Sequence, residues 1–349
     1  MSKILLIGSR QNKFDSTDTG GVSILFELLI SELEKRGIDF IVVDTLSANY
    51  GGKGKTLLYS LYYIFKNIRN VDYVSLHALR NSYLSLGPIL VVLSKIFKKN
   101  LSIRIFAGDF EDKYLTSNYI QKFLIRFILK NSNSVFFELK HLVYTFKKYN
   151  KNTYWFPNVR DEKIQKNKKR TFRKRFVYIG SINKEKGIDE LCQAIKWLDK
   201  DYTVDLYGPI KYDYEKYSDS YFKQLGINYK GALKSDEVLD VMDRYDVLIL
   251  PSYKEGYPGV IIEAFALGIP VIATKLPGIM EMCEHNQNSI LIDSKSSQQL
   301  LEAIKSIDDK IYSHLQKGAI KSFSNFNSRI QTNLFLKHIL KGEYVCVES

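Results

Sequence analysis

Short apolar segments alternate with longer amphipathic segments along the chain. In the first half, apolar runs rich in β-branched residues predict strands, and apolar residues spaced three and four positions apart predict helices. The predicted strands are residues 4–7, 38–43, 73–76, 101–106 and 134–137, and the predicted helices are residues 22–35, 57–68, 84–97, 120–129 and 139–149. Repeated strand–helix units of this kind are typical of a parallel sheet that is covered by helices on both faces.

The second half of the chain repeats this plan. Its predicted strands are residues 176–179, 204–207, 247–250 and 271–273, and its predicted helices are residues 188–198, 236–244 and 260–267. We therefore predict an α/β protein with two Rossmann-like, doubly wound parallel-sheet domains. Because ligands of open α/β sheets bind at the carboxyl ends of the strands, two such domains that face each other are expected to leave a ligand-binding cleft.

The boundary between the two domains is expected near residue 165. Phe156-Pro157-Asn158 and the basic run that follows it, residues 166–175, have little apolar content, which is typical of an exposed linker. Residues 330–340 predict a last amphipathic helix. The expected division is an N-terminal domain of residues 1–165, a second domain of residues 166–325 and a C-terminal segment of residues 326–349.

The composition excludes several classes of protein. With 349 residues, of which 45% are hydrophobic and 26% charged, the chain is too apolar for a disordered protein and too long for a single small module. No stretch approaches the roughly 20 apolar residues of a membrane-spanning helix, and the first residues are too few for a secretory signal, so we expect a cytoplasmic protein. Cys192, Cys283 and Cys346 lack the spacing of a zinc site or a disulfide framework and are expected to be reduced and mostly buried.

The net charge of +13 is concentrated in the first half of the chain. Residues 1–163 contain 24 lysines and arginines against 14 acidic residues, whereas residues 164–349 contain 27 against 24. A cationic half can attract nucleic acid, an anionic membrane surface or phosphorylated small molecules, and a solvated basic surface is the alternative. Residues 59–69, 89–99 and 119–130 combine apolar side chains with Lys and Arg, as helices on anionic lipid do, although core packing explains their apolar positions equally well.

The most informative segment is residues 250–270. A buried strand ends at Leu250, a loop with prolines and glycines follows, and a helix begins near Gly259. Backbone amides at such a helix start suit a diphosphate. Glu255 in the loop and Glu263 one turn into the helix can accept hydrogen bonds from hydroxyls on either side of it, from a sugar and from a ribose. Taken singly, they could also be an exposed loop carboxylate and a charge that favours the helix dipole.

This segment resembles a known family. The spacing of Glu255 and Glu263, within PSYKEGYP and before EAFALGIPVIAT, is similar to the E-x7-E motif of the retaining glycosyltransferases of family 4, which have the GT-B fold. The resemblance extends to Gly20-Gly21, to the strand that ends in His77, and to residues 156–159, 180–187 and 206–208. It implies that the last helix crosses back to the N-terminal domain.

The resemblance also implies roles for single residues. Glu255 would bind hydroxyls of the donor sugar, Glu263 would bind the ribose, and Lys186 would neutralise the departing diphosphate, which on physical grounds also needs a fixed cation or donor nearby. His77 would contact the donor sugar near the reacting carbon, with a structural histidine as the alternative. The other donor-binding residues would supply amides or a close backbone approach: Gly20, Gly21, Gly180, Gly256, Tyr257, Pro258, Gly259 and Val260.

Three positions depart from the family pattern. Ser181 stands where many members have an arginine beside the diphosphate, and Lys184 is a candidate to replace that cation. Ala107-Gly108 stands where many members have His-Gly, which bears on the acceptor side and not on donor binding. Pro277-Gly278 replaces the usual Gly-Gly pair.

Together these features predict a retaining glycosyltransferase of bacterial surface-polysaccharide synthesis, such as O-antigen or capsule. It would move a sugar from a nucleotide diphosphate sugar, most often a UDP-sugar, to a saccharide or lipid-linked acceptor. No Asp-x-Asp follows an apolar strand, so we expect no metal and no cofactor. The protein would work in the cytoplasm, on the anionic inner face of the plasma membrane.

Two alternatives belong to other classes. A nucleotide-sugar epimerase or hydrolase on the same fold would use the same donor site without an acceptor. A basic nucleic-acid-binding protein is suggested by the charge and by the 13% aromatic residues. Because the chain contains no recognised nucleic-acid motif, we do not expect a nucleic-acid partner.

Overall fold

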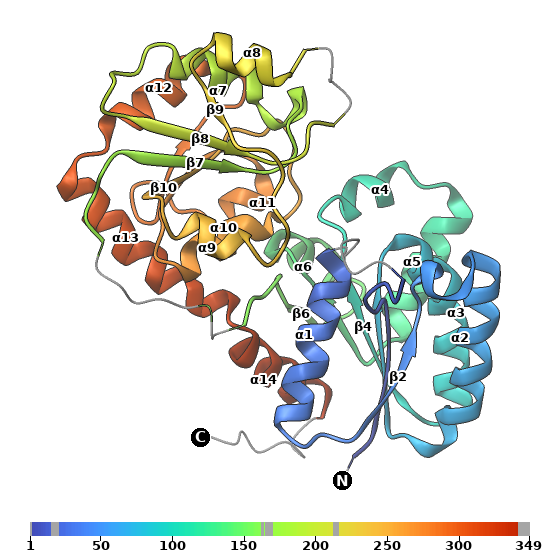
Figure 1. Cartoon of the computed structure of the whole chain (residues 1–349). Helices are drawn as coiled ribbons and strands as arrows, with labels where there is room; N and C mark the ends of the chain where they lie inside the picture. The colour runs from blue at the N-terminus through green and yellow to red at the C-terminus, as the bar shows by residue number, and fades with distance from the viewer. Residues whose placement is uncertain (1, 15–20, 162–163, 165–169, 212–215, 341–349) are drawn as a thin grey trace. The chain divides into compact units, whose positions relative to one another are not determined.

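The computed structural model describes residues 2–14, 21–161, 164, 170–211 and 216–340 (Figure 1). The chain divides into two compact units. Unit 1 comprises Met1–Arg160 and Asn327–Ser349, and unit 2 comprises Asp161–Phe326. The sequence places this division near residue 165.

Unit 1 is built around a six-stranded parallel sheet in the order β2-β1-β3-β4-β5-β6. Its strands are β1 (Ile4–Gly8), β2 (Phe40–Asp44), β3 (Tyr73–Ala78), β4 (Asn100–Ile105), β5 (Ser134–Phe137) and β6 (Thr153–Trp155). Its helices up to residue 146 are α1 (Gly21–Lys35), α2 (Lys53–Asn67), α3 (Arg80–Ile96), α4 (Phe110–Thr116), α5 (Tyr119–Asn131) and α6 (Lys140–Phe146). Residues 4–7 of β1 are completely buried, as expected for a strand of a covered parallel sheet.

Unit 2 contains a second six-stranded parallel sheet, in the order β12-β11-β10-β7-β8-β9. Its strands are β7 (Arg175–Ile179), β8 (Thr203–Tyr207), β9 (Asn228–Tyr229), β10 (Val247–Leu250), β11 (Val271–Thr274) and β12 (Ser289–Ile292). Its helices are α7 (Ile188–Ile195), α8 (Asp219–Gln224), α9 (Val238–Met242), α10 (Gly259–Ala266), α11 (Pro277–Met280), α12 (Ser297–Ser306) and α13 (Asp309–Phe323). The chain moves outward from β7 to β9 and then returns to β10 on the other side of β7, so β7 and β10 form the topological switch point of this sheet.

The last described helix, α14 (Ser328–Ile339), belongs to unit 1 and packs against α1 (Figure 1). Arg36, just after α1, donates from Nε to Oδ1 of Asn333 at 2.9 Å. It also contacts Oε2 of Glu32 at 2.6 Å, and the Glu32 side chain is only 4% exposed. Burial opposes the charged form of Glu32, but hydrogen bonds from Lys35 and Arg36 outweigh it and lower the pKa of this carboxyl. Arg36, which this buried ion pair holds in place, therefore joins the end of α1 to α14 through its hydrogen bond to Asn333.

The prediction of an exposed linker is wrong for two of its described residues, Phe156 and Arg170. Phe156 is 2% exposed, and its ring stacks on Phe335 of α14 at a centroid distance of 5.3 Å. The Arg170 side chain is 7% exposed and pairs with Asp243. It also donates from Nε to the carbonyl oxygen of Leu267 at 3.1 Å. Burial removes the apolar ring of Phe156 from water, and the ion pair and hydrogen bonds of Arg170 offset the cost of burying its charge.

Two further expectations concern the cysteines and the membrane. Cys192 and Cys283 are free and buried, as predicted, and burial raises the pKa of each thiol to about 12. Cys346 lies outside the described residues. Within the described part of the chain, no helix has both the length and the apolar character needed to cross a bilayer.

Candidate active site

Two loops follow the strands at the switch point of unit 2. The loop after β7 leads through the short 3-10 helix η4 (Lys184–Lys186) into α7, and the loop after β10 leads into α10. Carboxyl ends of neighbouring parallel strands meet at the same edge of a sheet, which brings these loops together. The amide of Tyr253 donates to the carbonyl oxygen of Glu185 at 2.8 Å and ties one loop to the other.

Lys186 and Glu255 form an ion pair across the two loops. The Lys186 Nζ lies 2.6 Å from Oε1 of Glu255, and Ser252 Oγ donates to the same oxygen at 3.0 Å. The Asn183 side chain holds the turn by accepting a hydrogen bond from the Lys186 amide at 3.2 Å. The two charged side chains are 27% and 14% exposed, so each keeps a surface that a ligand can reach. Glu255 is therefore a mostly buried carboxylate, fixed by its contacts with Lys186 and Ser252, and not a solvated loop residue.

Gly187 lets the two loops approach closely. Its backbone has a φ of +71°, and a Cβ at this position would lie 2.0 Å from the carbonyl oxygen of Pro251. Only glycine fits both conditions without a shift of the backbone. Gly278 plays a similar part on the other side of the loop, because its Cβ would lie 1.6 Å from the carbonyl oxygen of Gly256. Close contacts between backbone segments at these two glycines therefore fix the position of the loop that carries Glu255.

Helix α10 begins without a side-chain cap. Its N-cap residue is Pro258, and its first turn contains no acidic residue. The first amides of the helix therefore have no side-chain acceptor and form a donor-rich, positive end. Gly259 and Val260 are partly exposed there, and Glu263 lies one turn further along, also partly exposed. This helix start, Lys186 and Glu255 all follow the two switch strands.

The other donor-binding residues predicted in unit 2 differ in accessibility. Gly256 is exposed, whereas the Tyr257 ring is 7% exposed and packs against Phe326 at a centroid distance of 6.2 Å. The Gly180 amide donates to the carbonyl oxygen of Tyr207 at 3.0 Å and so continues the sheet towards β8. The missing side chain of Gly180 makes room for the hydroxyl of Tyr178, because a Cβ at this position would lie 2.8 Å from that oxygen.

The two predicted donor-binding glycines Gly20 and Gly21 belong to unit 1. Gly21 is the first residue of α1, and a Cβ there would meet no atom within 4 Å, so the packing of the protein does not require a glycine. Gly20 lies outside the described residues.

His77 is a buried residue of β3. It is 1% exposed, and its Nε2 lies 2.9 Å from Ser75 Oγ. Its ring lies 5.2 Å from that of Phe26 and 5.7 Å from that of Phe335, as centroid distances. Burial, with the nearby charge of Arg104, lowers the pKa of His77 well below its usual value, so the imidazole is neutral. This position fits the structural alternative, in which the histidine packs in the core of unit 1.

Sequence reasoning missed the residues that support the ion pair. Asn183 had a usable signal, because asparagine directly before a helical turn is a favoured N-cap. Ser252 had none, since a serine after a strand is common. The Tyr253 hydroxyl donates to the carboxylate of Glu190 and lies 2.6 Å from both of its oxygens, a contact between residues far apart in the sequence. Burial and this carboxylate raise the pKa of Tyr253, so its hydroxyl stays protonated.

No metal-binding cluster is evident in the part of the chain that the structure describes. No group of three or more His, Cys, Asp and Glu side chains is placed there to hold an ion.

The chain is similar in sequence to a family of known proteins and in structure to solved proteins. Residues 159–321 match the family model of the glycosyl transferases group 1. The crystal structure of Anabaena HepE in complex with UDP superposes with a TM-score of 0.72 at 16% identity, covering 97% of this chain and 100% of that one. The fold is GT-B.

Two curated relatives are similar to the GT-B chain over part of its length. TuaC of Bacillus subtilis, named as a glycosyltransferase of teichuronic acid biosynthesis, is 39% identical over 131 residues, 37% of this chain and 31% of TuaC. N,N'-diacetylbacillosaminyl-diphospho-undecaprenol alpha-1,3-N-acetylgalactosaminyltransferase of Campylobacter jejuni is 28% identical over 113 residues, 32% of this chain and 30% of that enzyme. The matched segment thus spans about a third of the length of these relatives.

Proposed function

We propose that this protein is a glycosyltransferase that moves a sugar from a nucleotide diphosphate sugar, a UDP-sugar above all, to a saccharide or lipid-linked saccharide acceptor. The family-model match covers residues 159–321, which include both Lys186 and Glu255. The structurally similar HepE binds UDP, and the names of the two relatives place them in teichuronic acid synthesis and in transfer to a diphospho-undecaprenol-linked sugar. These likenesses support a role in the synthesis of a surface polysaccharide.

The observation that carries this proposal is the contact of Lys186 Nζ with Glu255 Oε1 at the switch point of unit 2. A fixed cation, an uncapped helix start and a carboxylate follow the same two strands. A sugar diphosphate needs this set: positive charge and N–H donors for the phosphates, and an acceptor for sugar hydroxyls. A bound diphosphate would engage the ammonium and leave Glu255 to the sugar.

We propose a retaining mechanism of the family 4 type. The bond between the anomeric carbon and the diphosphate oxygen breaks, and its electron pair leaves with the nucleotide. Lys186 and the amides of residues 256–260 stabilise the charge that develops there, so the reaction requires no metal ion. The acceptor oxygen bonds to the anomeric carbon on the face that the diphosphate leaves, and its proton passes to the departing phosphate. Glu263 binds the ribose, and His77 stays in the core.

Nucleotide binding gives the most direct test. We expect UDP or another nucleoside diphosphate to raise the melting temperature of unit 2, because a ligand at 100 times its Kd stabilises the folded state by about 2.7 kcal/mol. The screen uses UDP, GDP, ADP, TDP and their sugars, with EDTA present. Transfer to an acceptor is then followed by NMR, which reports the anomeric configuration of the product.

The outcomes of this screen separate the candidates. Absence of a shift with every nucleotide would contradict the proposed donor site. Conversion of a nucleotide sugar at full rate without an acceptor would identify an epimerase or hydrolase. Loss of transfer in EDTA would contradict the metal-independent mechanism.

We further propose that unit 1 rests on an anionic membrane surface. Among the described residues, most exposed large hydrophobic side chains lie in unit 1, whereas unit 2 contributes Trp197, Met280 and Ile311. Four of them lie between residues 115 and 123, from the end of α4 into α5, and we name them the α4–α5 face: Leu115, Tyr119, Ile120 and Phe123, between 54% and 79% exposed. Lys113, Lys122 and Arg126 lie along the same stretch. Apolar side chains beside basic ones suit the boundary between headgroups and acyl chains.

The double variant Ile120→Ser/Phe123→Ser should bind vesicles containing anionic phospholipid at least about tenfold more weakly than the wild type, because it removes apolar area from the contact. Flotation at low salt measures the bound fraction. Trp197→Ser is the matched control, since it removes an exposed aromatic side chain from unit 2. Failure of the wild type to float with anionic vesicles would refute the membrane proposal.

A further inference from the structure

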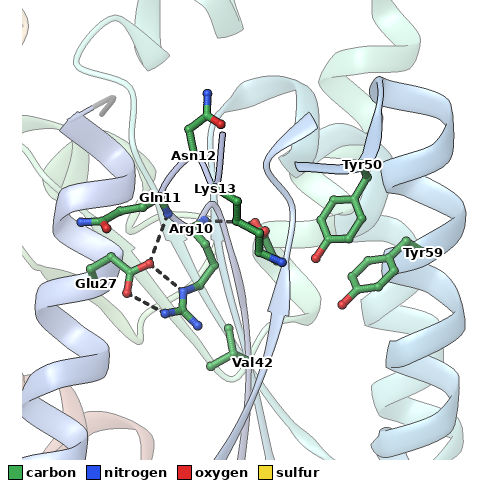
Figure 2. Close-up of a pocket in the computed structure, with 9 residues that line it drawn as sticks. Arg10, Gln11, Asn12, Lys13, Glu27, Val42, Tyr50 and Tyr59 are labelled. Carbon is green, nitrogen blue, oxygen red and sulfur yellow. Dashed lines mark hydrogen bonds and ion pairs between the residues drawn. The ribbon is translucent and has the colours of Figure 1, made fainter. Parts of the chain in front are cut away.

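A pocket of about 380 Å³ lies in unit 1 at the carboxyl ends of β1 and β2 (Figure 2). Residues 10–13, which follow β1, line one side. Tyr50, in the 3-10 helix η1 (Ser47–Tyr50), and Tyr59 of α2 line the other, with their rings stacked at a centroid distance of 4.0 Å. Val42 lies at the base, and both tyrosine hydroxyls point towards the space between the two sides (Figure 2). This pocket belongs to the other unit of the chain from the proposed donor site.

The first carboxylate of the pocket, that of Asp44, already accepts hydrogen bonds from other groups of the protein. Its Oδ1 accepts hydrogen bonds from the amides of Arg10 and Leu46 at 3.1 and 2.8 Å. Its Oδ2 accepts from Asn49 Nδ2 at 2.7 Å, and the residue is only 6% exposed. Asp44 therefore holds the loops that build the pocket and has little acceptor capacity left for a ligand.

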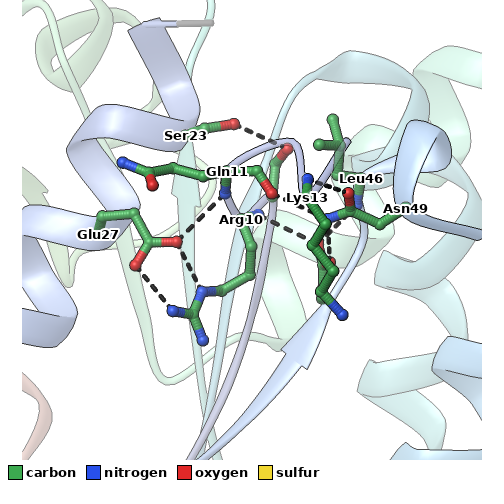
Figure 3. A network of polar contacts seen from close by, with 9 residues as sticks. Arg10, Gln11, Lys13, Ser23, Glu27, Leu46 and Asn49 are labelled. Atoms are coloured by element: carbon green, nitrogen blue, oxygen red, sulfur yellow. Dashed lines mark hydrogen bonds and ion pairs between the residues drawn. The ribbon is translucent and has the colours of Figure 1, made fainter. Parts of the chain in front are cut away.

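The second carboxylate, Glu27 of α1, is occupied in the same way (Figure 3). Arg10 donates to it in a bidentate manner, from Nε at 2.6 Å and from Nη2 at 2.9 Å. The Gln11 amide donates to Oε1 at 3.2 Å. This ion pair also raises the pKa of Arg10. The pair is internally neutral, and its strongest acceptor positions are filled.

The polar groups that still face the interior of the pocket are hydrogen-bond donors. Within the described residues, the only recorded interaction of the Lys13 ammonium is with the Tyr50 ring, whose centroid lies 5.5 Å away. Arg10 Nη1 makes no recorded hydrogen bond to the described residues. Burial, with hydrogen bonds to Tyr59 and Asp44, raises the pKa of Tyr50, so its hydroxyl stays protonated and is engaged with these two side chains. With both carboxylates engaged, the pocket offers N–H donors from Arg10 and Lys13, and among the residues that the structure describes Lys13 has no acidic partner.

We propose that this pocket binds a saccharide unit that carries an oxyanion, a carboxylate or a phosphate, as part of the acceptor. This inference rests on the proposed glycosyltransferase function. Lys13 and Arg10 Nη1 would bind the oxyanion, and the rings of Tyr50 and Tyr59 would contact the sugar. The volume falls in the range of small-molecule sites and suits a single sugar unit.

The test compares glucuronate and glucose 1-phosphate with uncharged glucose, using titration calorimetry on the full chain. We expect at least one of the two anionic sugars to bind more tightly than glucose, and Lys13→Gln to weaken that binding about tenfold, the effect of losing one charged hydrogen bond. The two anionic probes distinguish a carboxylate from a phosphate ligand. Lys66→Gln is the matched control: it also removes a lysine that lies over a tyrosine ring, that of Tyr63 at 5.9 Å, but this lysine does not line the pocket.

UDP binding is measured on the same samples, because it reports on unit 2. If UDP binds normally and neither anionic sugar binds better than glucose, up to about 20 mM, this inference is wrong and the proposed function stands. An equal loss of binding in Lys66→Gln would also overturn it, since the effect would then come from net charge. If UDP and all nucleotide sugars fail to bind, the proposed function fails, and the assignment of the pocket to an acceptor fails with it.

Discussion

The Lys186→Ala variant is expected to transfer sugar at least about 100-fold more slowly than the wild type, because it removes a fixed cation from a leaving group that gains negative charge. Glu255→Ala should lose a similar factor, since it removes the acceptor of the donor sugar and the group that orients Lys186. The measurement is kcat with a nucleotide sugar and an acceptor at saturation. In the same samples, the melting temperature without ligand shows whether unit 2 is intact.

The control and the double variant make this prediction specific. Lys254→Ala removes an exposed lysine next to Glu255 and should keep its turnover within about twofold of the wild type, because no ligand contact is assigned to it. The variant lacking both Lys186 and Glu255 should lose less than the product of the two single losses, because the side chains touch at 2.6 Å and act together. Near-normal turnover of both single variants would contradict the assignment of the site.

Gly187→Ala is expected to destabilise unit 2 by about 3 kcal/mol. The substitution forces a left-handed backbone conformation on alanine, which costs about 1–2 kcal/mol. It also places a Cβ 2.0 Å from the carbonyl oxygen of Pro251, so one of the two site loops must move, at a further cost of about 1–3 kcal/mol. Thermal unfolding should show a melting temperature lower by about 6–12 °C, and UDP should protect the variant less because the Lys186 and Glu255 loops no longer hold their spacing.

Gly226→Ala separates the two causes. Gly226 has a φ of +70°, close to that of Gly187, but a Cβ there would meet no atom within 4 Å. This variant should therefore lose only the conformational contribution, about 1–2 kcal/mol of the free energy of unfolding, and should bind UDP like the wild type. Equal destabilisation of the two variants would show that the close crossing at Pro251 does not hold the loops.

The elements of the fold were predictable where the local pattern is long or strongly apolar. The strands at residues 134–137 and 247–250 agree with β5 and β10 at both ends. Helix α4 and strand β6 were missed, because seven and three residues hold too few repeats of either period. Helices α12 and α13 were missed as well, since their exposed faces carry many polar residues and the apolar positions are thinly spaced.

The candidate site was predictable in its residue types but not in its contacts. Glu255, Glu263 and the glycines between them lie in one short segment, so their spacing is visible in the sequence. Lys186 lies 69 residues before Glu255, and their contact requires β7 and β10 to be neighbours. That neighbourhood depends on the strand order of the sheet, which local patterns do not encode.

His77 illustrates the same limit. A histidine at the end of an apolar run looks like a residue exposed at the edge of a sheet. In the structure its ring packs between Phe26 of α1 and Phe335 of α14, which begins about 250 residues later in the chain. Only the docking of α14 on α1 decides that this edge is covered.

The sequence by itself therefore determined the alternation of strands and helices, the two-sheet α/β class and the segment that carries Glu255 and Glu263. These properties depend on periodicity and spacing within about 20 residues, which hydrophobic burial and helix geometry translate directly into structure. The tertiary structure alone decided the Lys186–Glu255 ion pair, the burial of His77 and the donor-rich pocket beside Tyr50 and Tyr59. Each of these depends on which strands and helices pack side by side, and that choice is made by the free energy of the whole core and not by any one segment.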